Sequence, residues 1–179
     1  MLFVPSIPYN VGENRKKECP MVHITLISVG SLKEAYLRDA VAEYKKRLAA
    51  FAVCEEIELR EERIRDEEDA TAVRAALEAE GERILARIPD GAYTVALCIE
   101  GKEMDSETLA GELGRATDRT GKLCLIIGSS HGLCPAVKAR ADLRLSIGRL
   151  TYPHQLVRVL LHEILYRSFS ILAGKRYHK

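Results

Sequence analysis

Hydrophobic positions along the chain follow two alternating periods. Short apolar runs predict strands, and apolar residues at three- and four-residue steps predict helices. The strands are expected over 22–29, 53–59, 93–99, 122–127 and 143–146, and the helices over 32–51, 70–88, 105–117, 133–141 and 154–172. Because strands alternate with helices, we expect an α/β fold with a mostly parallel sheet and helices on both faces.

The first 20 residues do not share this pattern. Pro5, Pro8 and Pro20 interrupt them, and their basic cluster follows an apolar run, whereas a signal peptide has the opposite order. We therefore expect residues 1–20 to be a disordered or loosely attached extension, and residues 21–179 to form one domain large enough to bury a core without metal or disulfide. No apolar run reaches the ~18 residues of a membrane span, which excludes a transmembrane protein.

Cysteine content and charge narrow the function classes further. The five cysteines are odd in number and lack C-x-x-C spacing, which argues against a disulfide framework or zinc ribbon and favours a reducing, cytoplasmic compartment. The formal net charge is only +1, but the charged residues are unevenly distributed along the chain. We interpret nine acids over 55–69 as a solvated surface, whereas nine lysines and arginines against two acids over 138–179 favour a phosphate-binding face.

A glycine-rich turn, Gly128-Ser129-Ser130-His131-Gly132, joins a predicted strand to a predicted helix. In parallel α/β sheets, ligands bind at such turns. The spacing matches neither the dinucleotide fingerprint nor a Walker A loop, but it matches the G-x-S-x-G elbow of α/β-hydrolases. Ser130 would be the nucleophile, with Asp142 and His154 following in the required order. A serine hydrolase and a purely structural turn are therefore both open alternatives.

The last predicted helix, 154–172, is apolar around most of its circumference. So wide an apolar surface is either buried centrally or shared with a second copy of the chain. After this helix the chain ends in a basic tail with an aromatic residue, Gly174-Lys175-Arg176-Tyr177-His178-Lys179. Such a tail is suited to phosphate contacts and to stacking on a base.

Several spaced motifs in order resemble a known family over residues 21–179. They are Ser28-Val29-Gly30, Ile99-Glu100-Gly101-Lys102, Leu150-Thr151-Tyr152-Pro153-His154 and Tyr177-His178-Lys179, together with the glycine-rich turn. The sequence resembles the SPOUT class of RNA methyltransferases, and within it the large-subunit methyltransferase H family. Members of that family commonly carry a second glycine where this chain has Ser129, and an acid or amide where it has His131.

This resemblance implies a fold and an activity. The fold would be SPOUT-like, with a C-terminal trefoil knot whose loops bind S-adenosyl-L-methionine, in a homodimer with no metal. The reaction would be N3-methylation of a pseudouridine, position 1915, in 23S ribosomal RNA within the assembled ribosome. A non-catalytic ribosome-binding module is a further alternative.

The resemblance also implies site residues. The cofactor would contact Leu97, Gly128, Ile147, Gly148, Arg149, Leu150, Thr151 and Tyr152. RNA would contact Arg158, Arg176, Tyr177 and His178, although Arg158 is equally suited to a salt bridge with Glu163 or to a dimer contact. His154 is the candidate base that removes the proton from the acceptor nitrogen, with a structural contact as its alternative.

Overall fold

The computed structural model describes residues 21–175, so the predicted extension at 1–20 lies outside the described residues, as do residues 176–179. Within the described part, five parallel strands form one sheet in the order β2-β1-β4-β3-β5. The elements are β1 (Val22–Val29), α1 (Ala35–Leu48), β2 (Ala52–Leu59), α2 (Ala70–Leu85), β3 (Tyr93–Glu103), α3 (Ser106–Thr120), β4 (Lys122–Ile127), α4 (Pro135–Arg140), β5 (Leu143–Ser146) and α5 (His154–Leu172). The predicted α/β alternation and parallel sheet are confirmed.

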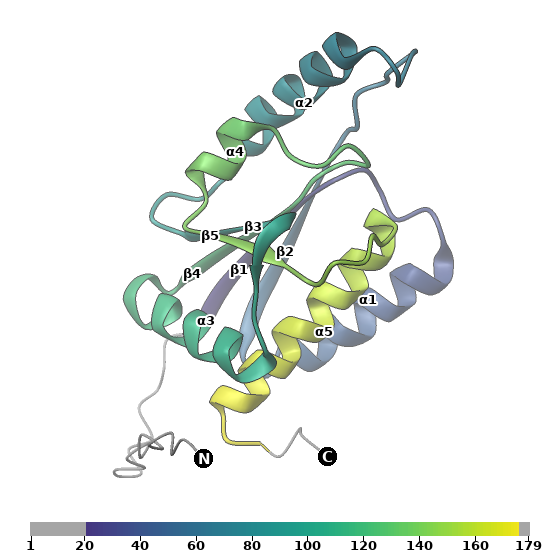
Figure 1. Cartoon of the computed structure of the whole chain (residues 1–179). Coiled ribbons are helices and arrows are strands. Elements are labelled where there is room, and N and C mark those ends of the chain that lie inside the picture. Colours follow the sequence, from purple (N-terminus) through teal and green to yellow (C-terminus); the bar gives the residue numbers. More distant parts are fainter. Residues whose placement is uncertain (1–20, 176–179) are drawn as a thin grey trace, which may run out of the picture.

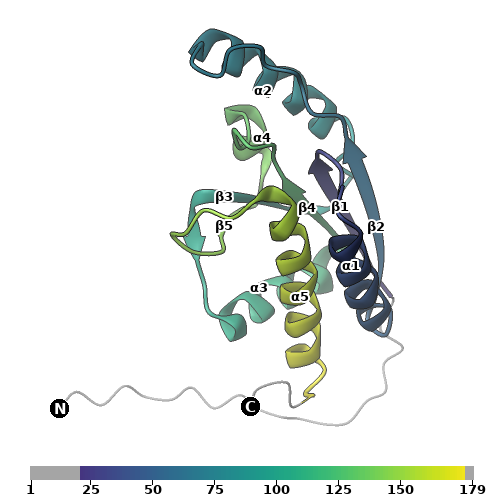
Figure 2. The same cartoon turned by 90° about the vertical axis from the view of Figure 1, so that its right-hand side faces the viewer.

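Helices cover both faces of the sheet, as predicted. Helices α2 and α4 lie on one side, and α1, α3 and α5 lie on the other (Figure 1; Figure 2). Successive residues of a strand point to opposite faces, so neighbours in β1 enter different cores. Leu26 packs with the α3 and α5 side, whereas Ile27 packs with Ile84 of α2 and Val137 of α4. The continuously apolar central strands are therefore buried on both faces.

Helix α3 begins at Ser106, one residue later than the predicted range of 105–117. The residue before the helix, Asp105, is its N-cap, and the Asp105 carboxylate accepts a hydrogen bond from the Thr108 N–H at 2.7 Å. An aspartate at this position satisfies an N–H that the first helical turn leaves unpaired.

Strand β3 is longer than predicted and bends around β5. The prediction ended it near Ile99 because Glu100-Gly101 is typical of a turn. Instead, Leu97 and Lys102 both pair with Leu145, and the register of the strand pair shifts between them. A Cβ at Gly101 would lie 2.6 Å from the carbonyl carbon of Leu145, so only glycine allows this close approach. The carboxyl end of β3 therefore wraps the short strand β5.

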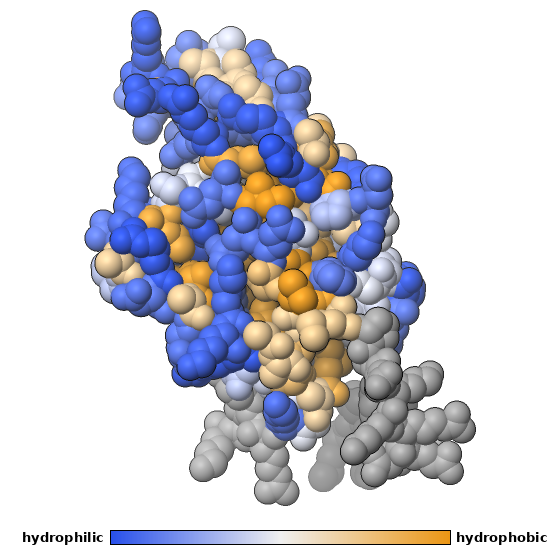
Figure 3. Space-filling view, turned by 180° about the vertical axis from the view of Figure 1, so that it is seen from behind, coloured by the Kyte–Doolittle hydropathy of each residue, from blue (hydrophilic) through white to orange (hydrophobic). Residues whose placement is uncertain are grey.

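The apolar circumference of α5 is explained mostly by burial within the chain. Leu161, Leu165 and Phe169 enter the core, while Leu156 and Leu172 are exposed near the helix ends. The face of the molecule that is turned away in Figure 1 includes the β2 edge of the sheet. Apolar side chains gather down the middle of this face (Figure 3). Over residues 21–175, no helix is long and apolar enough to cross a membrane.

Candidate functional site

A cavity of about 340 Å³ opens at the carboxyl ends of β3, β4 and β5 and reaches the first turn of α5. Its volume lies within the ~300–1,000 Å³ typical of small-molecule sites. Apolar side chains form much of the wall, including Leu97, Ile127, Leu133, Leu145 and Val157. The cavity lies where parallel α/β sheets bind ligands, because the loops that follow adjacent strands converge there.

The glycine-rich turn forms one wall of this cavity and is tightly folded. The Gly132 N–H donates to the Ser129 carbonyl at 3.0 Å. A Cβ at Gly128 would lie 2.1 Å from the Gly132 carbonyl oxygen, which is a backbone atom that cannot move aside. Position 128 therefore requires glycine because the turn closes on itself, and the compact turn brings its backbone to the cavity.

The loop after β5 forms the facing wall. Its start is fixed by Ser146, whose hydroxyl donates to the Gly148 carbonyl at 3.1 Å and accepts from the Gly148 N–H at 3.2 Å. Gly148 has φ +148°, a backbone conformation that side chains disfavour. Of the eight residues predicted to contact a cofactor, seven line the cavity: Leu97, Gly128, Ile147, Gly148, Leu150, Thr151 and Tyr152.

Arg149 is the exception among the predicted cofactor residues. Its side chain is 93% exposed, and its Nε lies 3.6 Å from a carboxylate oxygen of Glu103 on β3. The guanidinium therefore does not line the cavity, and a cofactor contact by this side chain does not fit the structure.

An ion pair in the cavity wall was missed by sequence reasoning. Lys138 of α4 donates to Glu100 of β3 at 2.5 Å, and both residues line the cavity. The hydrogen bond from Lys138 holds the pKa of Glu100 below its usual value. Beside them, burial and the Glu100 charge raise the pKa of Cys98, which keeps that thiol protonated and unreactive. The residues are far apart in sequence, and only the Ile99-Glu100-Gly101-Lys102 motif offered a signal.

His154 lies where the cavity meets a second, polar groove. The groove has a volume of about 840 Å³ and is lined by residues 61–65 after β2, by α2 and by the glycine-rich turn. His154 and residues Ser129, Ser130 and His131 line both spaces. A Cβ at Gly30 would lie 3.4 Å from the His154 Nε2, so the ring packs against the end of β1. The half-buried His154 side chain therefore faces both spaces.

The catalytic triad of a serine hydrolase is not assembled. The Asp142 carboxylate accepts a hydrogen bond from the Thr94 N–H at 2.8 Å and fixes the start of β5 against β3. The Ser130 hydroxyl lies 3.4 Å from a Glu61 oxygen and 3.2 Å from the Nδ1 of its neighbour His131. Asp142 thus holds backbone rather than orienting a histidine, and the G-x-S-x-G match does not indicate hydrolase chemistry.

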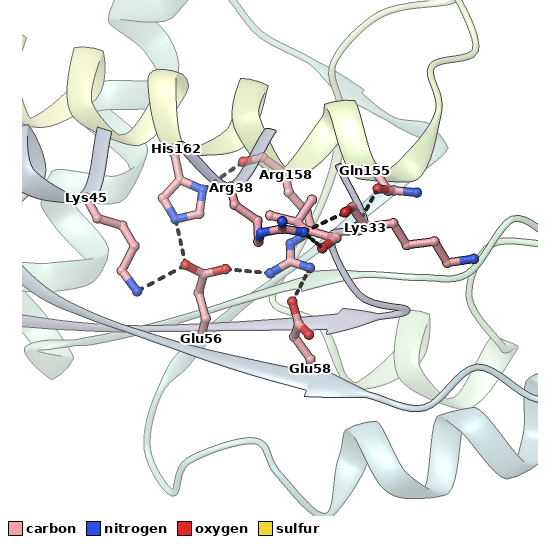
Figure 4. A network of polar contacts seen from close by, with 9 residues as sticks. Lys33, Arg38, Lys45, Glu56, Glu58, Gln155, Arg158 and His162 are labelled. Carbon is pink, nitrogen blue, oxygen red and sulfur yellow. Dashed lines mark hydrogen bonds and ion pairs between the residues drawn. The ribbon is translucent and has the colours of Figure 1, made fainter. Parts of the chain in front are cut away.

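Arg158 is an interior residue and not an RNA contact. Its side chain is 3% exposed, and it donates to Glu56 at 2.6 Å and to Glu58 at 2.7 Å across the interface between β2 and α5 (Figure 4). The RNA role predicted for Arg158 is therefore wrong, because its guanidinium is buried and a phosphate cannot reach it. The suggested alternative partner was also wrong, since Glu163 instead pairs with Arg167 at 2.6 Å.

The same network corrects the interpretation of the acidic run. Glu56 is 13% exposed at its side chain, and it contacts Lys45 and His162 as well as Arg158 (Figure 4). Burial opposes the charged carboxylate, but the nearby His162 and the ion pairs with Arg158 and Lys45 outweigh it and lower the pKa of Glu56. At Glu56 the acidic run is therefore part of a buried network that ties the β2 edge to α5.

The remaining predicted site residues fall outside what the structure describes. Arg176, Tyr177 and His178 lie beyond residue 175. Over the described residues, no three His, Cys, Asp or Glu side chains gather in a way that could hold a metal ion. Together these features define an α/β protein with a ligand cavity at the carboxyl ends of its parallel strands.

Comparison with known proteins identifies the family. Residues 22–178 match the family described as predicted SPOUT methyltransferase. Curated relatives named ribosomal RNA large subunit methyltransferase H include one from Streptococcus thermophilus, 49% identical over 87% of this chain and 99% of the relative, and one from Bacillus pumilus, 45% identical over 88% and 100%. A crystal structure of the SpoU methyltransferase AviRb from Streptomyces viridochromogenes, in complex with AdoMet, is similar with a TM-score of 0.42 and 13% identity, over 86% of this chain and 61% of that one.

The chain belongs to the SPOUT methyltransferase family. It is therefore a methyltransferase, and its methyl donor is S-adenosyl-L-methionine. The residues of the cavity fit this donor: aliphatic side chains and tightly folded glycine backbone suit an adenosyl group, and the Glu100–Lys138 pair offers charges of both signs for an amino-acid group.

Proposed function

We propose that this chain methylates N3 of a pseudouridine, the one at position 1915 in the numbering of the family's substrate, in 23S ribosomal RNA. The observation that carries the proposal is the cavity formed by Leu97, by the turn at Gly128 and by the loop 147–152, in a chain 43–49% identical to curated ribosomal RNA methyltransferases. S-adenosyl-L-methionine supplies, when bound, an electrophilic methyl group on a positively charged sulfur.

The donor site follows from chemical matching between the cavity and this ligand. Leu97, Ile147 and Leu150 supply apolar surface for the adenine ring, and Gly128 and Gly148 let the main chain approach its edge. Thr151 and Tyr152 close the loop over the site. Lys138 is placed to bind the carboxylate of the methionine part, and Glu100 its ammonium group. The protein's contribution is to hold the methyl carbon in line with the acceptor nitrogen.

His154 is the proposed base. Its ring borders both the cavity and the polar groove, so a nucleotide entering by the groove would meet the imidazole beside the methyl donor. The N3 proton would pass to a nitrogen of this ring, and the N3 electron pair would form the new carbon–nitrogen bond. The carbon–sulfur bond would break with its electron pair remaining on sulfur.

The trefoil knot is proposed for the segment from β4 to α5. Support comes from the double pairing of Leu145 with Leu97 and Lys102, because β3 bends around the strand that precedes the donor loop. The close approach of Gly101 to the Leu145 backbone leaves no room for a side chain between these strands. A threaded chain would hold the loop 147–152 against the turn at Gly128 without the help of a ligand.

We propose that the enzyme works as a homodimer in the cytoplasm, on the assembled ribosome. Ile99, Leu150 and Tyr152 are exposed by 64, 70 and 40%, and Leu150 and Tyr152 belong to the loop that closes the donor cavity. A second copy would cover this apolar rim and complete the site. Arg176, Tyr177 and His178 are the proposed RNA contacts.

The proposal is tested by methyl transfer from tritium-labelled S-adenosyl-L-methionine to ribosomes, with and without prior pseudouridylation of 23S RNA. We expect incorporation into 23S RNA only in pseudouridylated ribosomes, and a sharp loss with H154A, which removes the imidazole. Equal incorporation into ribosomes with and without pseudouridylation would refute pseudouridine as the methylated nucleotide. Sedimentation should show twice the 20.0 kDa of one chain, and a monomer that retains full activity would refute the dimer.

A further inference from the structure

Glu80 is a buried carboxylate that joins two segments of the site. Its side chain is on the last part of α2 and is 3% exposed. One oxygen, Oε1, accepts a hydrogen bond from the Glu62 N–H at 2.9 Å, and the other, Oε2, accepts one from the Ser129 hydroxyl at 2.8 Å. Both hydrogen bonds span long sequence separations, so Glu80 holds the segment after β2 and the glycine-rich turn in fixed positions.

The contact with Ser129 determines which way that residue's side chain points. Ser129 lines both the donor cavity and the polar groove, whereas Glu80 lines only the groove. The hydroxyl of Ser129 is therefore drawn toward the groove side, and the side chain itself is buried. Because Ser129 directly follows Gly128, its orientation affects the backbone that faces the donor.

The segment after β2 is held by the same helix at a second point. Arg83, one helical turn after Glu80, contacts the Glu62 carboxylate at 2.6 Å. The Glu62 main chain is held by Glu80 and its side chain by Arg83, so α2 positions the wall of the groove through which we expect the nucleotide to enter.

We propose that Glu80 is a positioning residue of the methyl-donor site, acting through Ser129. This inference rests on the proposed function only in taking the cavity as the donor site. The carboxylate anchors the wall that the donor cavity shares with the nucleotide groove, so the turn at 128–132 is set for the donor before it binds. An unanchored turn would sample other positions, and a ligand would have to fix it at a cost in affinity.

The test is titration calorimetry of S-adenosyl-L-methionine with a set of variants, well below their thermal midpoints. E80A should weaken binding about tenfold, because it removes the two carboxylate oxygens that accept one hydrogen bond from each segment. E80Q should bind within about twofold of the unchanged protein, because its amide oxygen accepts from Glu62 and its NH₂ group donates to Ser129. E82A, an exposed glutamate of the same helix, is the matched control and should not change affinity.

S129A removes only the Ser129 hydroxyl. It breaks the same contact with Glu80 and keeps the inference testable if E80A fails to fold. It should weaken donor binding by a smaller factor of about threefold, and E80A/S129A should bind no more weakly than E80A, since both changes break the same contact. Equal affinity of E80A and the unchanged protein would overturn the inference, as would a double variant in which the two losses multiply. If the unchanged protein itself does not bind the donor, the proposed function fails instead.

Discussion

Glu56 of β2 and His162 of α5 face each other inside the protein, with Oε1 and Nε2 3.6 Å apart. His162 is fully buried, and its Nδ1–H donates to the Arg158 carbonyl at 2.7 Å. Burial opposes the charged imidazolium, but the neighbouring Cys54, the Glu56 carboxylate and the Arg158 carbonyl outweigh it and raise the pKa of His162 to about 9. The buried network is therefore expected to hold a protonated histidine at neutral pH.

This pKa predicts a loss of stability in alkaline solution. The pKa of His162 is higher in the folded state than the ordinary 6.5, so its contribution is complete below pH 6.5 and disappears as the pH rises through about 9. The free energy of unfolding should fall by up to ~1.4 kcal/mol per pH unit in that window. Urea unfolding of H162Q should show a flatter dependence, and an unchanged slope would contradict the assignment.

Glu56 predicts a second loss on the acid side. Its folded pKa is lowered, so its contribution is present above the ordinary value of 4.5 and is lost as the pH falls below it. The free energy of unfolding should therefore decrease from about pH 4.5 downward. Urea unfolding of E56Q over the same acid range should lack the part of this decrease that Glu56 causes.

R158A should be among the most destabilising single changes in the chain. It leaves the largely buried Glu56 without its closest partner, and breaking a buried pair in this way costs about 3–5 kcal/mol. K45A removes a more exposed partner of the same carboxylate and should cost less than about 1 kcal/mol. Urea midpoints measure both, and similar costs for the two variants would show that Arg158 is not the central partner.

G128A should weaken binding of S-adenosyl-L-methionine at least tenfold, and G128V should abolish it, because any Cβ at this position meets the Gly132 carbonyl. G91A is the matched control: Gly91 has φ +71° in the turn before β3, and a Cβ there meets no atom within 4 Å. The control should lose about 1 kcal/mol of stability and keep donor affinity. Normal binding by G128V would show that the donor site lies elsewhere.

K138M tests the ion pair in the cavity wall. If Lys138 binds the donor's carboxylate, the variant should bind S-adenosyl-L-methionine several-fold more weakly, and added salt should affect its binding less than that of the unchanged protein. K122M, at the far end of β4, is the control and should change neither quantity. Equal salt dependence in K138M and the unchanged protein would exclude the contact.

Residues in the site were predicted with uneven success, for identifiable physical reasons. The family resemblance implied Gly128 and the loop 147–152, and all of these residues except Arg149 line the cavity, because the loops that follow adjacent parallel strands converge there. Arg158 was misassigned because its charge alone does not reveal that Glu56 and Glu58 lie opposite it, about 100 residues earlier in the chain. Glu80, Lys138 and the polar groove carried no sequence signal, because their partners are brought together only by the packing of α2 and α4 on the sheet.

The sequence by itself determined the order and type of the elements, because hydrophobic period and turn residues are local properties. It also determined the family, because the motifs recur in order over the whole domain. Only the tertiary structure decided that β3 bends around β5, that the acidic run includes a buried partner of Arg158, and that Ser129 is held by Glu80. Each of these depends on contacts between distant segments, whose energies are fixed by the burial and geometry that folding creates.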